Sequence, residues 1–124
     1  MDRPHIITRH LGEALWVVRL EGEHDLASVP DLRQTVDEIY EKGTCLIVDV
    51  SAAAFIDSSI LVELVRANER ADASPDEKLA VVASPGSPAG RLCDLAGVDD
   101  AWFFRFDSMS TAIAWCNGRL ERLR

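Results

Sequence analysis

The sequence has few of the features that mark disulfide-rich or thiolate-metal proteins. Only three of its 124 residues are cysteines, they are widely spaced, and no C-x-x-C pair occurs. A disulfide framework or a thiolate cage is therefore not expected, and we predict no metal site. We instead expect the thiols to be buried as small apolar groups. They belong to Cys45, Cys93 and Cys116.

Long apolar runs are also absent. The longest stretches, such as residues 45–48, have the length of a strand, far below the ~20 residues that a membrane-spanning helix needs. The chain opens with MDRPHIITRH, which carries early charges and no apolar signal region. We therefore expect a cytoplasmic protein that does not insert into a membrane.

Positive charge is scarce. The chain has 13 Lys and Arg against 21 Asp and Glu, which gives a formal net charge of −8 with His neutral. An acidic domain repels phosphate backbones, so a direct nucleic-acid partner is not expected. A protein surface that carries basic groups is the better match.

What the chain does have is enough apolar material for one folded domain. Apolar residues make up 48% of it and charged residues 27%, which is ordinary for a soluble domain of this size. We predict a single domain over residues 1–124.

Hydrophobic periodicity alternates between strand and helix along the chain. Strands are expected at 14–21, 44–50, 79–83 and 102–106. Helices are expected at 28–42, 58–73 and 89–95, and a last one after residue 107 or 108. Ser28 is expected to cap the first helix and Gly43 to end it. This alternation predicts an α/β fold with a mixed, mostly parallel sheet of four to five strands and about four helices, with residues 6–8 as an antiparallel edge strand.

In such sheets functional groups gather where strands end and helices begin. Here those junctions are GEHD, FIDSS and SPGSP. In FIDSS, the Asp57 carboxylate can accept hydrogen bonds from the first free amides of a helix, with Ser58 and Ser59 in its first turn. Plain capping is one interpretation. The other is a hydroxyl that accepts a phosphate, because a helix N-terminus attracts anions.

Enzyme chemistry has weaker support. A hydrolytic triad can be assembled on paper from Ser58, His24 and Asp25, but the chain has no G-x-S-x-G elbow. SPGSP lacks the spacings of a nucleotide cradle. We therefore expect neither an enzyme nor a bound cofactor, and an enzyme or nucleotide-binding module that uses GEHD and SPGSP stays as an alternative.

The three junctions together resemble the STAS domain family, and within it the stand-alone bacterial anti-sigma factor antagonists. The segment RLEGEHDLASVPDLRQTV resembles the family's L-x-G-E-L-D strand end, and LIVDVSAAAFIDSSIL resembles its Asp-Ser-Ser/Thr-Gly-Leu signature. The last third resembles the family's Pro-containing loop and Leu-x-x-x-Gly helix. In this order the matches cover nearly the whole chain and imply a STAS-like fold.

The resemblance implies a partner switch. In that family the unmodified domain binds an anti-sigma factor, which is also a serine kinase of the histidine-kinase-like ATPase fold, and so frees a sigma factor. Phosphorylation of the serine after the signature Asp ends the binding, and a PP2C-type phosphatase reverses it. Carried over by motif position, the acceptor is Ser58, with Ser59 as the second candidate. A monomer or weak dimer is expected.

The resemblance also implies a docking surface around the acceptor. Its residues would be Glu23, His24, Asp25, Asp57, Ser58, Ser59, Ile60, Val62 and Arg66. Ile60 and Val62 stand where the family commonly has glycine, and Val62 shares a helix face with Ser58. A bulky group there could block a kinase or contact a different one. The alternative is a non-switching STAS scaffold, in a signalling assembly or as a subunit of a transporter. His24 replaces an apolar family residue, and we expect its side chain to be exposed.

Overall fold

The computed structural model describes residues 2–12, 14–42 and 45–123, with side chains as far as residue 120. Its sheet has the strand order β1-β2-β3-β5-β6, and β4 pairs with β2 off this path. Every pairing is parallel except that of β1 with β2. The predicted α/β fold and antiparallel edge strand are therefore confirmed. The strands are β1 (His5–His10), β2 (Leu15–His24), β3 (Cys45–Asp49), β4 (Ala53–Ile56), β5 (Lys78–Val82) and β6 (Phe104–Phe106).

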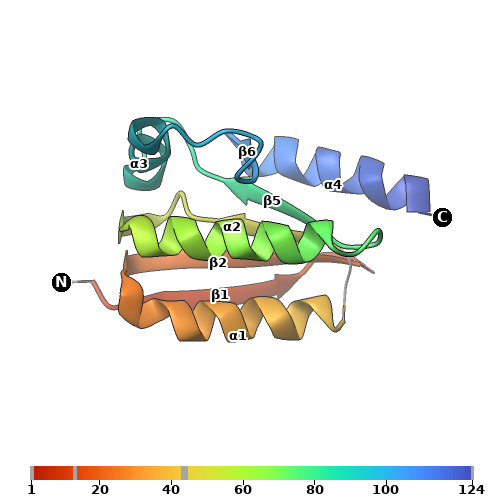
Figure 1. Ribbon diagram of the computed structural model, residues 1–124, viewed down its shortest axis with the longest axis horizontal. Coiled ribbons are helices and arrows are strands. Elements are labelled where there is room, and N and C mark those ends of the chain that lie inside the picture. The colour runs from red at the N-terminus through yellow and green to blue at the C-terminus, as the bar shows by residue number, and fades with distance from the viewer. Residues whose placement is uncertain (1, 13, 43–44, 124) are drawn as a thin grey trace.

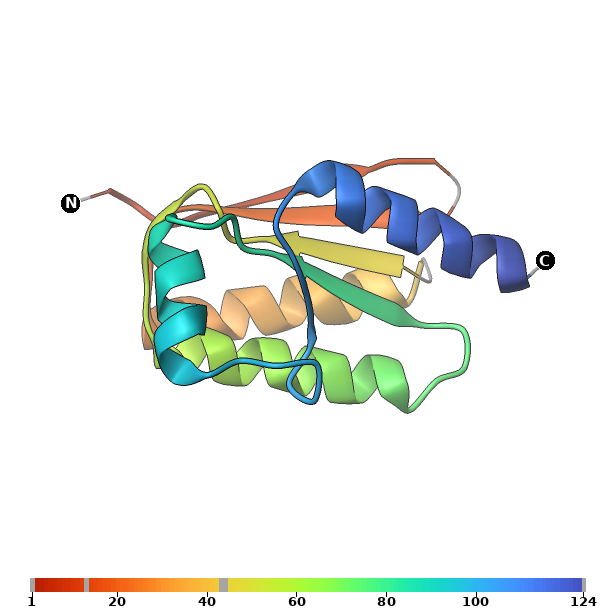
Figure 2. The ribbon, with the colours of Figure 1, turned by 90° about the horizontal axis from the view of Figure 1, so that it is seen from above.

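Helices cover both faces of the sheet. The helices α1 and α2 lie side by side on one face, and α4 lies on the other (Figures 1 and 2). A short 3₁₀ turn, η1, precedes α1 and joins it to β2. The bounds are η1 (Leu26–Ser28), α1 (Val29–Tyr40), α2 (Ser58–Asp72), α3 (Pro88–Ala96) and α4 (Met109–Leu123).

The core is split by the sheet into two layers, as the alternation in β2 predicts. Val18 and Leu20 face the layer under α1 and α2, whereas Leu15 and Val17 face the layer under α4. A strand places successive side chains on opposite faces, so one strand supplies both layers. All three cysteines are buried free thiols, as expected.

Two neighbouring segments differ from the prediction, and both shape the functional end of the sheet. β2 does not end at residue 21 but runs to His24, so GEHD is largely strand. Residues 53–56, which lie between a predicted strand and a predicted helix, form β4 and pair in parallel with this extension. The segment is rich in alanine and too short to show a period, so its sequence carries no strand signal of its own.

Helix starts follow the prediction only in part. Ser28 occupies the position before α1, but its side chain makes no capping hydrogen bond, so the predicted cap is wrong. Asp25 instead caps η1, accepting the Ala27 N–H at 2.9 Å. At the end of α3, Gly97 adopts a left-handed conformation with φ of 70°. Gly43 and the expected first strand residue Thr44 lie outside the described residues.

An ion pair between an exposed arginine and a buried glutamate joins α1 to α2. From the helical period, Glu63 is expected on the solvent side of α2, but it is buried. Arg33 donates from Nε and Nη2 to the two carboxylate oxygens of Glu63, at 3.1 and 2.9 Å. A neighbouring helix that supplies such a bidentate donor makes burial of a carboxylate tolerable, and single-helix periodicity cannot show it.

The N-terminal segment packs directly against the backbone of Gly22. Its φ is 82°, and a Cβ at this position would lie 2.0 Å from the carbonyl oxygen of Arg3. The next residue, Glu23, donates its backbone N–H to the Asp2 carbonyl oxygen at 3.2 Å. Both the left-handed backbone and the close approach therefore require glycine.

We expect Gly22→Ala to destabilise the protein by about 1–3 kcal/mol, because it adds a clash to left-handed backbone strain. It should also release residues 2–4, seen as faster hydrogen exchange of the Glu23 amide. Urea unfolding measures the first effect and exchange the second. Gly86→Ala is the matched control, since Gly86 has a φ of 80° with open space around it. Equal losses in the two variants would contradict the role of the N-terminal segment.

Candidate functional site

The paired ends of β2 and β4 bring two of the predicted junctions together at the start of α2 (Figure 1). Glu23 pairs with Phe55, and His24 pairs with Ile56. The Asp57 backbone N–H then donates to the His24 carbonyl oxygen at 3.3 Å. The acidic end of β2 therefore lies beside the first turn of α2, although the two are far apart in sequence.

Asp57 caps α2 and distinguishes the two serines that follow it. Its backbone is extended, and its Oδ1 accepts the Ser59 N–H at 3.0 Å. The same carboxylate oxygen accepts a hydrogen bond from the Ser59 hydroxyl. The Ser59 side chain is thus part of the cap. Ser58 is exposed, and its hydroxyl takes part in no side-chain hydrogen bond within the described chain, so it is the more accessible of the two.

The docking residues implied by the resemblance divide into a surface group and a buried pair. Glu23, Asp57 and Ser59 are partly exposed. Val62 is 66% exposed and lies one turn beyond Ser58. Asp25, Ser58 and Arg66 are exposed too. His24 and Ile60 are fully buried.

The expected exposure of His24 is wrong, because the extension of β2 places this side chain inside the fold. Its Nε2 lies 2.8 Å from the Glu21 carbonyl oxygen, which accepts the hydrogen bond. Its Nδ1 is buried without a hydrogen-bond partner among the described residues. The ring is therefore part of the core under the site and is not a contact for a partner. Ile60, on α2, is likewise buried in the main core.

Three exposed apolar side chains flank the serine, and sequence reasoning found only one of them. Leu26 lies directly after the acidic end of β2, and Phe55 precedes Asp57 by two residues. With Val62 they are exposed apolar side chains on η1, β4 and α2, the segments next to the start of α2, and we call the three the apolar rim. Phe55 could have been found had β4 been recognised, since its partner Glu23 is also at the surface. Beyond Val62, an apolar groove of about 280 Å³ continues to Trp102.

The site is acidic and has no cation paired within it. Glu23, Asp25 and Asp57 form no ion pair with any Lys or Arg in the described ranges. A phosphate adds a charge of about −1.5 to −2. On Ser58 it would therefore add to a negative surface, while the free amides at the start of α2 could still receive it.

In the SPGSP loop, the serines hold the loop together. The Ser84 hydroxyl donates to Ser51 Oγ at 2.9 Å, and Ser87 Oγ accepts the Gly90 N–H at 3.0 Å. Gly90 is needed for close packing, because a Cβ there would lie 2.2 Å from the Ser84 carbonyl oxygen. Neither serine side chain is left over for a ligand in this arrangement.

The described residues contain no group of three or more His, Cys, Asp or Glu side chains that could hold a metal ion. No helix among them is long and apolar enough to span a membrane.

Similar folds occur among solved structures. An anti-sigma factor antagonist from Mycobacterium paratuberculosis matches with a TM-score of 0.77 and 24% identity, over 91% of this chain and 93% of that one. The anti-sigma factor antagonist SpoIIAA in its unphosphorylated form matches with a TM-score of 0.72 and 17% identity, over 92% and 97%. Phosphorylated SpoIIAA from Bacillus matches with 0.62 and 20%, over 97% and 100%. At these identities the likeness concerns the fold.

The comparison with curated proteins found no match. The model of the STAS domain matches residues 5–108. This range contains all six strands, the helices α1, α2 and α3, and the serine site at the start of α2. The match spans far more than half of the sequence, so the chain belongs to the STAS domain family.

Proposed function

We propose that this chain is an anti-sigma factor antagonist with a phosphorylation switch at Ser58. The unphosphorylated surface around Ser58 binds an anti-sigma factor, which then releases its sigma factor. The observation that carries the proposal is the free, exposed Ser58 hydroxyl in the first turn of α2, next to the Asp57 cap. The similar folds of two anti-sigma factor antagonists support it.

The switch follows from charge and shape. In the unmodified state the apolar rim of Leu26, Phe55 and Val62 provides contact area for a partner. A phosphate on Ser58 adds bulk to this surface and increases the negative charge next to Asp57. A partner packed on the hydroxyl is then displaced. SpoIIAA, which shares the fold, has been solved in phosphorylated and unphosphorylated forms.

The partners follow from the family resemblance. The anti-sigma factor is also the serine kinase, of the histidine-kinase-like ATPase fold, and a PP2C-type phosphatase restores Ser58. The chain acts in the cytoplasm as a single domain over residues 1–124, as a monomer or weak dimer. It influences transcription through protein contacts alone, consistent with its net charge of −8, and has no enzymatic activity of its own.

A non-switching scaffold is the second candidate, and Val62 is the observation that favours it. This side chain is large, apolar and exposed one turn beyond Ser58. In that case the same rim is a permanent contact inside a larger assembly, and the serine serves only as part of the helix start.

The first prediction concerns the acceptor. Incubation with the cognate kinase and ATP should place one phosphate on Ser58, because Ser59 is hydrogen-bonded in the Asp57 cap. Peptide mapping by mass spectrometry locates it, and Ser58→Ala should abolish it. Modification of Ser59 alone, or none by a kinase that is active on another substrate, would contradict the switch.

The second prediction concerns affinity for the anti-sigma factor. We expect Ser58→Asp to weaken binding about tenfold or more, or about 1.4 kcal/mol, because it adds charge to an acidic surface. Ser58→Ala should bind within about twofold of the unmodified protein. Titration calorimetry measures both. Ser110→Asp is the matched control, since it adds the same charge to another exposed serine near a helix start. Equal affinity of the two Ser58 variants would place the interface elsewhere.

The third prediction tests whether Val62 is a contact. We expect Val62→Ala to weaken binding of the anti-sigma factor about fivefold, because it removes roughly 1 kcal/mol of apolar burial. Leu11→Ala is the control, as Leu11 lies beyond the opposite end of β2. Unchanged binding together with faster phosphorylation would show that Val62 blocks the kinase and does not contact the partner.

A further inference from the structure

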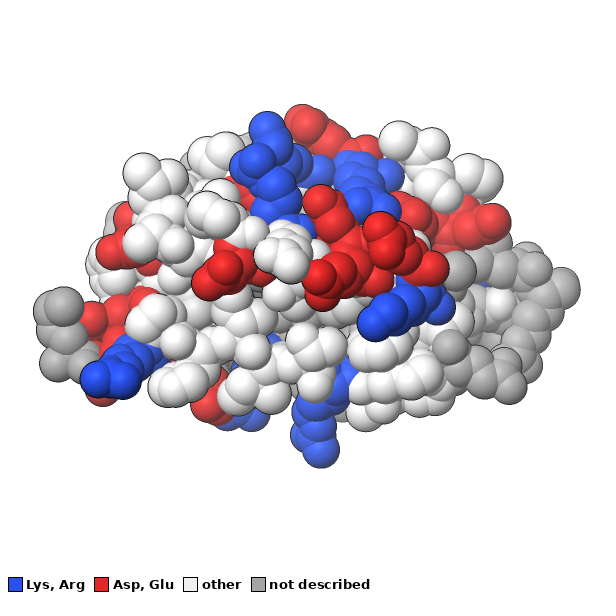
Figure 3. Space-filling model, turned by 90° about the horizontal axis from the view of Figure 1, so that it is seen from below, with Lys and Arg blue, Asp and Glu red and all other residues white. Residues whose placement is uncertain are grey.

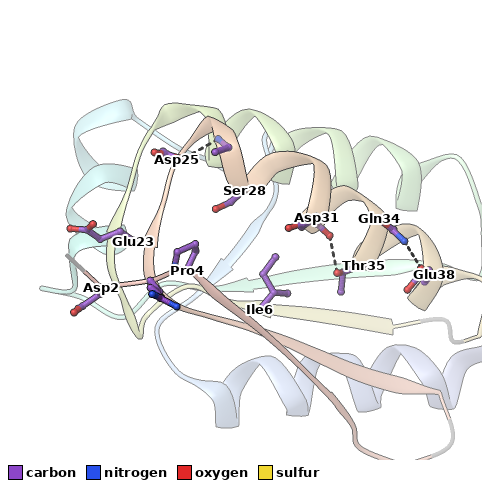
Figure 4. A pocket seen from close by; sticks show the side chains of 12 residues that line it. Asp2, Pro4, Ile6, Glu23, Asp25, Ser28, Asp31, Gln34, Thr35 and Glu38 are labelled. Atoms are coloured by element: carbon purple, nitrogen blue, oxygen red, sulfur yellow. Dashed lines mark hydrogen bonds between the residues drawn. The ribbon is translucent and has the colours of Figure 1, made fainter.

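An acidic groove lies beside the serine site, between the N-terminal segment and the outer side of α1 (Figure 4). Its volume is about 590 Å³. Five carboxylates line it, from three separate parts of the chain: Asp2, Glu23, Asp25, Asp31 and Glu38. Arg3 is the one cationic residue in the lining. The groove therefore carries a strong negative potential, which its concave walls concentrate.

These carboxylates have no cationic partners, in contrast to several others on the surface. Asp37 pairs with Arg70, and Asp94 pairs with Arg105. None of the five groove carboxylates forms an ion pair within the part of the chain that the structure describes. The face that contains α1 carries a band of acidic groups across its middle (Figure 3).

A hydroxyl without a hydrogen-bond partner in the described chain gives an independent sign of a ligand. Ser28 lines the groove and is only 6% exposed, and its hydroxyl makes no capping hydrogen bond with α1. In Figure 4 its oxygen points into the space between the N-terminal segment and α1. Because Ser28 is largely buried as a residue while its oxygen faces the groove, a ligand in the groove that donates a hydrogen bond could satisfy this hydroxyl.

The walls suit one kind of side chain. Pro4 and Ile6 supply apolar surface, and Asp31 and Asp25 supply charge. Arginine and lysine have this combination, because their aliphatic stems pack on apolar groups while their charged ends meet carboxylates. An arginine also brings several N–H donors, enough for a carboxylate and the Ser28 hydroxyl together.

We propose that this groove binds a basic segment of the protein partner, with its arginine or lysine side chains placed between α1 and the N-terminal segment. Glu23 and Asp25 belong to both the groove and the serine site, so a partner seated on Ser58 extends directly into it. The identity of that partner as the anti-sigma factor rests on the proposed function. The preference for a basic segment does not.

Titration of the full-length, ¹⁵N-labelled chain with hexa-arginine tests the groove without any kinase. We expect amide shifts centred on Ser28, Asp31 and Thr35, and none with hexa-glutamate. Asp31→Asn should weaken hexa-arginine binding about two- to fivefold, the range of one exposed charge pair. Asp76→Asn removes the same charge beyond the other end of α2 and should change affinity less than that.

Three results would overturn the proposal that the groove binds a basic segment. They are shifts spread evenly over the acidic surface, equal losses from Asp31→Asn and Asp76→Asn, and spermidine binding as tightly as hexa-arginine. Ser28→Ala tests the hydroxyl, and we expect about a twofold loss with an unchanged circular dichroism spectrum. Hexa-arginine binding without phosphorylation of Ser58 would refute only the switch. Phosphorylation without peptide binding would refute only the groove.

Discussion

The parallel pairing of the end of β2 with β4 is the constraint on which the rest of the structure depends. This register places His24 opposite Ile56 and sets the Asp57 N–H against the His24 carbonyl oxygen. Asp57 is thereby held where its carboxylate can cap α2, and Ser58 emerges at the surface. The same extension of β2 carries Gly22, on which the N-terminal segment rests. The serine site and the acidic groove thus both depend on the end of β2.

Much of the fold could be predicted from the sequence, because it depends on local periodicity. The alternation of apolar side chains along β2 places the two layers of the core correctly. The errors arise where a neighbouring segment decides the outcome. β4 is a strand because β2 offers it an edge, and Glu63 is buried because α1 brings Arg33 against it. The hydrophobic period of a single segment predicts neither the strand at β4 nor the burial of Glu63.

The candidate site shows the same division. The Asp57 cap and its two serines are predictable, because a helix start has a local signature. The burial of His24 and Ile60 is not, because it depends on how β2 and α2 are seated on the core. The apolar side chains Leu26 and Phe55 were missed for a related reason. Exposed apolar groups are recognised only after the surface itself is known, and this surface is built from three separate segments.

The packing of the N-terminal segment against Gly22 also affects where a tag or fusion can be attached to the protein. Because it holds Asp2 in the lining of the acidic groove, the N-terminal segment runs along that groove. The other end of the chain leaves from α4, on the opposite face of the sheet (Figures 1 and 2). A purification tag or fluorescent fusion at the N-terminus would crowd the groove, and a polyhistidine tag would offer it a cationic occupant at low pH. Fusions and surface immobilisation are therefore best made through the C-terminus.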